Sequence, residues 1–168
     1  IFSMGCGPAQ EVQQFFATGT PCDQSEFVLA DFNDETLAHT NSALIESQKR
    51  HGCHAKIRLI KKTVHQLVKQ SERTVQYPKA EQYDLIYCAG LFDYLSDKVC
   101  RKLMDIFYNM LAPQGLLIAT NVDVHPSRNE MEYFLEWHLI HRNAEKLRSR
   151  APGRCQPENG RMVWEQTG

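Results

Sequence analysis

Two glycines and an aspartate near the start of the chain have the residue types and the spacing of a nucleoside-binding site. Gly5 and Gly7 follow a short apolar run, and Asp31 ends the next apolar run, 24 residues after Gly7. Glycine lets a backbone turn tightly and approach a ligand because it has no Cβ atom. A carboxylate roughly 20 residues further on can accept hydrogen bonds from both hydroxyls of a ribose. The alternatives are a plain strand-to-helix turn for the glycines and a helix N-cap or a solvated strand end for Asp31. The pairing of the glycines with Asp31 favours the ribose site.

The residue at position 10 argues against a dinucleotide cofactor. The dinucleotide pattern G-x-G-x-x-G needs a third glycine at this place, and this chain has Gln10 there. A cofactor without a phosphate needs only the close approach at Gly5 and Gly7. The pattern therefore favours a nucleoside that carries no pyrophosphate.

Short apolar runs alternate with amphipathic segments along the chain, and this alternation predicts the elements that position these residues. The runs predict strands over 1–4, 26–31, 56–60, 82–88 and 116–121. Helical periodicity predicts helices over 8–18, 34–50, 64–71, 97–111 and 128–144. Asp34 and Ser96 are the expected N-caps, and Pro113 and Gly115 are expected to end the fourth helix. The order predicts an α/β fold with a doubly wound, mostly parallel sheet, in which ligands bind at the carboxyl ends of the strands.

Four segments together resemble the motifs of class I S-adenosylmethionine-dependent methyltransferases. They are IFSMGCGPAQEV, FVLADFNDETL, YDLIYCAGLFDYL and MLAPQGLLIATNV, and they extend over residues 1–122. The order and spacing of the four are more specific than any one of them. The resemblance implies a Rossmann-like methyltransferase fold, S-adenosylmethionine as the cofactor, and methyl transfer as the activity.

The resemblance also assigns the cofactor contacts to residues that lie at or just after strand ends. In chain order these are Ser3, Gly5, Cys6 and Gly7 around the methionine and ribose portion, Asp31 at the ribose hydroxyls, Phe32 against adenine, Thr63 and Val64 near the adenine edge, and Cys88, Ala89 and Gly90 beside the methyl group. The chain departs from the family at two of these positions. The family often has an acid where this chain has Ser3, and another near Thr63.

The residues that could act as a general base follow the fourth and fifth strands. The candidates are Asp93 and Tyr94, and then Asp123 and His125. Each has a structural alternative as a turn, packing or loop residue. A carboxylate acceptor has a pKa of about 4 and is already ionised at neutral pH, whereas an alcohol usually needs a base. The weakness of the candidates therefore fits a carboxylate acceptor.

A narrower resemblance bears on the acceptor. The segments CAGLFDYLSDKVCRKL and NEMEYFLEWHLIHR are similar to bacterial proteins that make the methyl ester of 3-hydroxypalmitic acid. The helix expected over 128–144 has two apolar faces and is therefore expected to be buried on two sides. One face should pack on the sheet. The other fits core packing, a lipophilic pocket, a partner chain or contact with the N-terminal segment expected to be missing. Arg142 in this helix is either a surface arginine or a partner for a substrate carboxylate.

Composition limits the other functions. The formal net charge of −1 gives no basis for nucleic-acid binding. No apolar stretch approaches the roughly 18 residues of a membrane span, and no signal peptide is visible. The six cysteines include no C-x-x-C pair, which predicts reduced, buried thiols and a cytoplasmic location. His51, Cys53 and His54 match no standard zinc spacing, so no metal is expected.

The predicted organisation is a cofactor-binding core over 1–144, followed by a polar tail over 145–168 with a candidate strand at 161–165. An N-terminal segment and a final strand of the fold are expected to be missing from this sequence. The predicted partner is a small-molecule acceptor, and the oligomeric state is left open. Alternatives are a catalytically silent cofactor-binding or regulatory domain, a methyltransferase for another acceptor class, and a nicotinamide-dependent oxidoreductase.

Overall fold

The computed structural model describes residues 1–73, 82–123, 128–134 and 136–150. The chain divides into two compact units, and the boundary lies between Leu67 and Val68. Both units contain parallel strands connected through helices, as the alternation in the sequence predicts.

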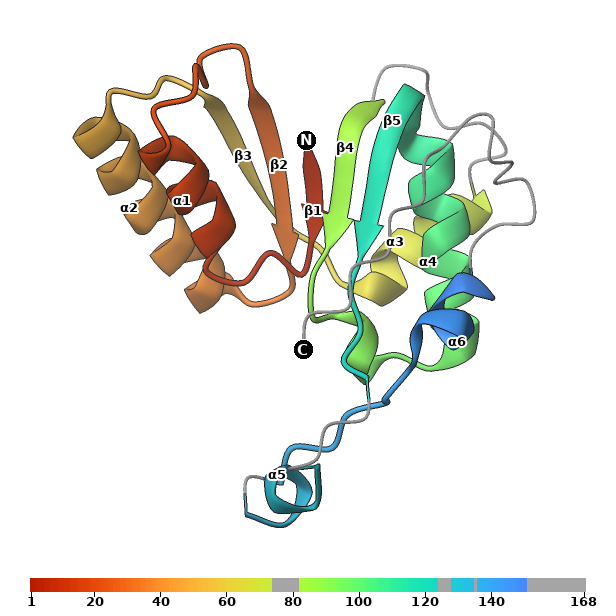
Figure 1. Cartoon of the computed structure of the whole chain (residues 1–168). Helices are drawn as coiled ribbons and strands as arrows, with labels where there is room; N and C mark the ends of the chain where they lie inside the picture. Colours follow the sequence, from red (N-terminus) through yellow and green to blue (C-terminus); the bar gives the residue numbers. More distant parts are fainter. Residues whose placement is uncertain (74–81, 124–127, 135, 151–168) are drawn as a thin grey trace. The chain divides into compact units, whose positions relative to one another are not determined.

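The first unit holds three parallel strands. These are β1 (Phe2–Met4), β2 (Glu26–Asp31) and β3 (Lys56–Lys61), with β2 between the other two. Met4 is level with Ala30, and Asp31 is level with Lys61, so these strands end at a common edge. The crossovers are α1 (Gln10–Ala17) and α2 (Asp34–His51), which lie side by side next to the strands in Figure 1. The predicted strands and helices of this unit are confirmed to within three residues.

The core of the first unit lies between its helices and strands. Val12 and Phe16 of α1 are buried, as are Phe27 and Leu29 of β2 and Leu44 of α2. The rings of Phe16 and Phe27 meet edge to face with centroids 5.8 Å apart. Burial of such apolar side chains is worth about 1.5–3 kcal/mol each, which makes this packing the main stabilising contribution of the unit.

The N-cap of helix α2 lies one residue earlier than the sequence predicts. Asn33, not Asp34, is the N-cap, and its side chain accepts hydrogen bonds from the N–H groups of Glu35 and Thr36. Asp34 is the first helical residue and forms an ion pair with Lys61. A carboxylate in the first turn is still favourable because it lies at the positive end of the helix dipole.

Two of the cysteines correct the prediction of reduced thiols. Cys22 and Cys53 form a disulfide, which joins the loop before β2 to the turn between α2 and β3. No local pattern indicates this bond, because the partners are 31 residues apart and only the fold brings their Cα atoms to 5.9 Å. The prediction is confirmed for three cysteines, which are free and buried: Cys6, Cys88 and Cys100. Cys155 lies outside the described residues.

The second unit holds two parallel strands and its own helices. The strands are β4 (Tyr83–Cys88) and β5 (Leu111–Ala119), and they pair from Tyr83 to Cys88 with a register shift between Tyr83 and Leu85. Helix α3 (Val64–Arg73) begins before the unit boundary and ends after it. The short turn η1 (Phe92–Tyr94) and α4 (Asp97–Met110) connect the strands. Helix α4 buries the apolar face that its periodicity predicts, including Leu103, Ile106, Phe107 and Met110.

The last strand of the described residues begins earlier than predicted, and the candidate strand at 161–165 lies outside those residues. β5 starts at Leu111, directly after α4, so Pro113 and Gly115 stand inside the strand rather than before it. A Cβ atom on Gly115 would lie 2.9 Å from the carbonyl oxygens of Ala112 and Tyr83. Gly115 is therefore required by the close approach of β4. Ser96 is the N-cap of α4, as predicted, but its side chain makes no capping hydrogen bond.

The helix predicted over 128–144 is wrong over residues 136–143. Of the described residues in this range, those of α5 (Arg128–Phe134) are helical, and Ala144 begins a separate helix, α6 (Ala144–Arg148), with Asn143 as its N-cap. Between them, Glu136 has a left-handed φ of 50°. Apolar periodicity could not reveal this break, because it does not report where the backbone finds its hydrogen-bond partners.

Those partners lie in other segments. The N–H of Ile140 donates to the carbonyl of Asp93 at 2.7 Å, and the N–H of Arg142 donates to the carbonyl of Val122 at 3.1 Å. Tyr133 and Phe134 are 81% and 76% exposed, so the expectation of a helix buried on two sides is also wrong.

Arg142 is neither a surface arginine nor free to bind a substrate carboxylate. It is 3% exposed, and its guanidinium donates to Asp97, to Asn121 Oδ1, and to the carbonyls of Phe92 and Leu95, all at 2.6–2.9 Å. The residue therefore holds η1 and the segment after β5 together. The hydrogen bond from Arg142 lowers the pKa of Asp97 below its ordinary value. The stability from this pair is thus present at neutral pH and is lost as the pH falls through that lowered pKa.

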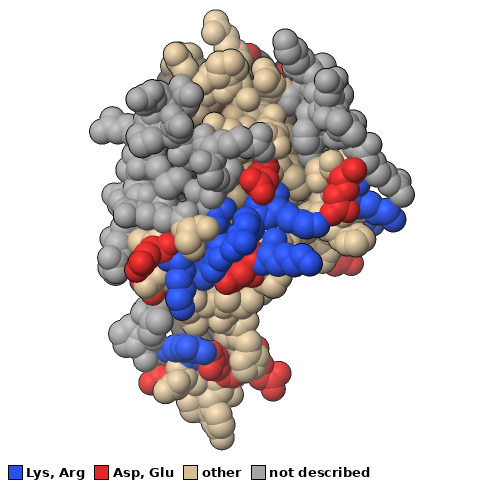
Figure 2. All heavy atoms as spheres, turned by 90° about the vertical axis from the view of Figure 1, so that its right-hand side faces the viewer, with Lys and Arg blue, Asp and Glu red and all other residues tan. Residues whose placement is uncertain are grey.

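None of the helices in the described part of the chain is both long enough and apolar enough to cross a membrane. The face drawn in Figure 2 carries lysine and arginine side chains in a band with acidic side chains beside them. In the second unit, Lys102 pairs with Glu72 and Arg150 pairs with Asp97. Part of the positive charge of this unit is therefore neutralised locally.

Replacement of Arg142 tests its structural role. Arg142→Met should lower the free energy of unfolding by about 2–4 kcal/mol, because it leaves buried carbonyls without a donor. Asp97→Asn, the matched control, should cost about 1 kcal/mol or less, since the exposed partner is lost while the carbonyl contacts remain. Urea unfolding followed by circular dichroism measures both. Equal effects of the two variants would contradict this assignment.

Removal of the disulfide tests its contribution to the first unit. The double variant Cys22→Ser/Cys53→Ser should lose about 3–4 kcal/mol of unfolding free energy relative to the oxidised protein, because the cross-link closes a loop of roughly 30 residues. Reduction of the wild-type protein in a chelator should produce the same loss. Unchanged unfolding after reduction would show that the two sulfurs are not bonded in solution.

Candidate functional site

The glycine loop and Asp31 meet at the edge where β1 and β2 end. The N–H groups of Gly5 and Cys6 donate to the carbonyl of Ala30 at 2.8 and 3.1 Å, which anchors the loop to β2. Gly5 and Gly7 have φ values of 71° and 50°, in the left-handed region that glycine adopts at little cost. Helix α1 follows after Ala9, which is itself left-handed and buried.

Asp31 is the centre of this arrangement. One carboxylate oxygen accepts the N–H of Gly7 at 3.1 Å, and the other accepts the N–H of Asn33 at 3.0 Å. The residue is 6% exposed. Each carboxylate oxygen can accept about two hydrogen bonds, so both keep a lone pair for a further donor. The structure thus brings together the two glycines and the acid that the sequence singled out.

Thr40 completes the support of the loop, and the sequence analysis did not identify it. Its hydroxyl donates to the carbonyl of Gly7 at 2.7 Å, and the side chain is fully buried in α2. Gly7 is therefore held through both its N–H and its C=O, by residues of β2 and α2. Thr40 stands at a buried helical position, and no motif marks it.

The other predicted residues of the first unit lie at or near the same strand ends. Phe32 follows Asp31 and is 64% exposed, which is unusual for an aromatic ring of this size. Ser3 is buried in β1, and its hydroxyl has no hydrogen-bond partner among the described residues. Burial and the charges of Asp31 and Glu11 raise the pKa of the Cys6 thiol to about 12, so it stays protonated and unreactive.

Thr63 is committed to the start of α3. Its hydroxyl accepts the N–H of Gln66 at 3.1 Å, and its own N–H donates to Gln66 Oε1 at 2.9 Å. This reciprocal pair is a capping box, for which the spacing T-x-x-Q is the sequence signal. The hydroxyl proton of Thr63 remains as a donor. Val64 is the first residue of α3 and is partly buried.

The predicted residues at the end of β4 and directly after it lie in the second unit. Cys88 is fully buried, and desolvation raises the pKa of its thiol to about 12. Ala89 and Gly90 are exposed, and Gly90 has a φ of 77°. The N–H of Gly90 donates to Thr120 Oγ1 at 2.9 Å, which ties this turn to the end of β5.

Asp93 has the environment of a structural or proton-accepting carboxyl group. It is 4% exposed, and Oδ1 accepts the N–H of Val122 at 2.7 Å. Burial raises its pKa, and the hydrogen bond from Val122 and the charge of Arg142 oppose that rise. A buried carboxyl group with a raised pKa is a better base at neutral pH than an exposed one.

Of the remaining candidates for a general base, Tyr94 and Asp123 have other contacts, and His125 is not among the described residues. Tyr94 is 56% exposed, and its hydroxyl accepts a hydrogen bond from Trp137 Nε1 at 2.7 Å. The carbonyl of Asp123 lies 3.0 Å from His141 Nδ1. Trp137 was not predicted to meet Tyr94, because the two are 43 positions apart.

Comparison with known proteins places the chain by its fold and not by its sequence. No protein-family model matches it, and no curated protein does either. It is similar to solved structures over most of its length. The magnesium protoporphyrin IX methyltransferase from Synechocystis PCC 6803, solved with bound SAH, matches with a TM-score of 0.60 at 8% identity. The match covers 89% of this chain and 59% of that one.

Two further structures show the same likeness. The pyocyanin biosynthetic protein PhzM matches with a TM-score of 0.62 at 12% identity, over 89% of this chain and 42% of that one. An O-methyltransferase family protein from Burkholderia thailandensis matches with a TM-score of 0.60 at 11% identity, over 89% of this chain and 43% of that one. The chain thus spans about three fifths or less of the length of these proteins. At these identities the comparison shows the fold, which is that of the class I methyltransferases.

Proposed function

We propose that the first unit binds the nucleoside end of S-adenosylmethionine and that the protein transfers the cofactor's methyl group to a small molecule. The position of Asp31 supports this most directly. Its carboxylate lies at the end of β2, held between the N–H groups of Gly7 and Asn33, with free acceptor capacity on both oxygens. Two vicinal hydroxyls of a ribose are the natural donors for such a fixed pair of oxygens.

Three further features of the first unit fit this cofactor. Gly7 has open space where a Cβ atom would stand, so a ligand can approach the backbone there. Phe32 offers an exposed ring next to Asp31, which suits contact with a purine. Ser3 has a buried hydroxyl without a partner among the described residues, which suits a hydrogen bond to a polar part of the ligand. The assignment of Cys88, Ala89 and Gly90 to the methyl group remains a prediction from the resemblance.

The favoured acceptor is a carboxylate such as that of a hydroxy fatty acid. S-adenosylmethionine supplies a methyl group on a sulfonium, which is already activated for in-line displacement. The protein then has to align the acceptor and exclude water. The second unit exposes several large apolar side chains after β4 and β5: Tyr94, Val122, Tyr133, Phe134, Trp137 and Ile140. These side chains favour a lipophilic acceptor over a small polar one.

Two alternatives make different predictions. A catalytically silent domain of the same fold would bind S-adenosylmethionine without turnover on any acceptor. A nicotinamide-dependent oxidoreductase would bind a nucleotide that S-adenosylmethionine does not displace. Calorimetry with each ligand, followed by product detection across fatty acids, other acids and alcohols, separates the three functions and the acceptor classes.

Substitution of Asp31 tests the cofactor site. Asp31→Asn should weaken the binding of S-adenosylhomocysteine about 10- to 100-fold, because it removes a charge and places an amide N–H₂ against one of the two N–H donors. Asp34→Asn is the matched control, since Asp34 is an exposed carboxylate on the same segment. It should leave the affinity within about twofold. Titration calorimetry measures both. Equal affinities for the Asp31 variant and the wild type would rule out the ribose contact.

Substitution of Asp93 tests whether the reaction uses a base. With a carboxylate acceptor, Asp93→Asn should change kcat by less than about tenfold, because the acceptor is already ionised and the amide oxygen can still accept the N–H of Val122. A general base would instead cost about 10²- to 10⁴-fold. The pH profile gives a second measurement. Activity that rises with pH through the raised pKa of Asp93, and loses this rise in the variant, would contradict a base-free reaction.

A further inference from the structure

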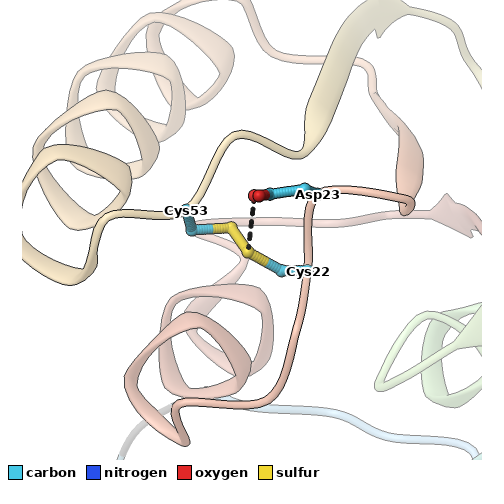
Figure 3. Close-up of side chains that lie close together, drawn as sticks. All are labelled: Cys22, Asp23 and Cys53. Atoms are coloured by element: carbon cyan, nitrogen blue, oxygen red, sulfur yellow. Dashed lines mark hydrogen bonds between the residues drawn. A yellow bond between two sulfur atoms is a disulfide. The ribbon is translucent and has the colours of Figure 1, made fainter.

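Three potential metal ligands meet at the end of the first unit that is opposite the glycine loop. Cys22 and Asp23 belong to the loop that leads into β2, and Cys53 belongs to the turn that leads into β3. One ligand atom from each residue lies within 4.8 Å of the other two. Figure 3 shows the Asp23 carboxylate beside the sulfur atoms of Cys22 and Cys53. The cofactor site uses none of these residues.

The carboxylate of Asp23 is fixed in this position. Its Oδ1 accepts the N–H of His54 at 2.7 Å and lies 3.7 Å from Cys22 Sγ. Asp23 is exposed, whereas Cys22 and Cys53 are only 5% and 3% exposed. An exposed carboxylate thus lies next to two buried sulfurs, where it can serve as a ligand to an ion.

The spacing suits a tetrahedral ion once the two sulfurs are separate. Zn–S and Zn–O bonds of about 2.3 and 2.0 Å at tetrahedral angles place sulfur and oxygen ligands about 3.5 Å apart and two sulfurs about 3.8 Å apart. The distance from Cys22 Sγ to Asp23 Oδ1 is already 3.7 Å. The Cα atoms of the cysteines are 5.9 Å apart. Rotation of the cysteine side chains can therefore bring the sulfurs to the required separation.

We propose that Cys22, Cys53 and Asp23 form a redox-controlled zinc site. In the oxidised protein the sulfurs form the disulfide. A dithiol reductant transfers two electrons and two protons to this bond, becomes a disulfide itself, and leaves two thiols on the protein. Zn²⁺ then binds both sulfurs as thiolates, which releases two protons to solvent, and the Asp23 carboxylate is the third protein ligand. Water fills the fourth position.

The other described cysteines do not compete for the ion. Cys6, Cys88 and Cys100 are buried and free, and none of them lies in a described group of three metal-ligating side chains. Burial raises the pKa of the Cys6 and Cys88 thiols to about 12, which disfavours the thiolate that a metal needs. Among the described cysteines, zinc uptake by the reduced protein therefore reports on Cys22 and Cys53.

Metal titration of the whole chain tests the site. The protein is first reduced with a dithiol in the presence of a chelator, and the dithiol and the chelator are then removed under anaerobic conditions. The reduced protein is titrated with Zn²⁺ in competition with a chromogenic chelator. The reduced protein should bind one equivalent, and the oxidised protein should bind none. Co²⁺ in place of Zn²⁺ should give the intense sulfur-to-metal charge-transfer band and the visible bands of a tetrahedral site.

Variants assign the ligands. Cys22→Ser and Cys53→Ser should each weaken binding by at least about 100-fold, and Asp23→Asn by about 10-fold or more. Cys100→Ala and Glu26→Gln are the matched controls, a buried free cysteine and an exposed acid at the start of β2. Both should keep the wild-type affinity. Circular dichroism checks the folding of each variant, and Asp23→Asn tests the site even if the cysteine variants unfold, because it retains both sulfurs.

Three results would overturn the proposal. The first is a reduced wild-type protein that binds no zinc. The second is binding that persists without loss when Cys22 and Cys53 are both replaced. The third is an affinity of Asp23→Asn equal to that of Glu26→Gln. The experiment does not depend on cofactor binding, so its failure leaves the proposed methyl transfer untouched.

Discussion

The hydrogen bonds to the Asp31 carboxylate organise the candidate site. This single side chain accepts the N–H of Gly7 from the loop after β1 and the N–H of Asn33 at the start of α2. A buried carboxylate is costly unless it is hydrogen-bonded, so both neighbours are held in place by the same electrostatic requirement. Thr40 then binds the other side of Gly7 from within α2. The loop geometry is thus set by β2 and α2 together. The backbone N–H groups of Gly7 and Asn33 fix the orientation of the Asp31 carboxylate and therefore of the lone pair that remains on each oxygen.

A second buried charge plays the corresponding role in the other unit. Arg142 satisfies the carbonyls of Phe92 and Leu95 and pairs with Asp97. These contacts hold the turn after β4 and the segment after β5 in one arrangement, beside which Tyr94 and Trp137 are hydrogen-bonded and exposed. Arg142 therefore has a structural role. An acceptor carboxylate would have to bind without the help of this arginine.

The first unit can be divided into two ends with separate chemistry. Asp31 and the glycine loop lie where the strands end, and the Cys22–Cys53 disulfide lies where β2 and β3 begin. Helix α2 connects the ends, since Asn33 caps its start and Cys53 follows its C-cap, Gly52. A change at the sulfurs acts on the same helix that carries Thr40.

The sequence by itself determined the α/β order, the strands of the first unit and the residues of the glycine loop and Asp31. These follow from short-range physics: alternating apolar runs, glycines that turn a backbone, and an acid at a fixed offset. The predicted 26–31 strand and the Gly5–Gly7 loop are confirmed for this reason. The ligand roles of these residues remain predictions. Only the tertiary structure decided the Cys22–Cys53 bond, the burial of Arg142, and the break at Glu136 that ends the predicted helix. Each depends on partners tens of residues away, and one-dimensional periodicity carries no information about which distant groups will satisfy a buried sulfur, a buried charge or an unpaired N–H.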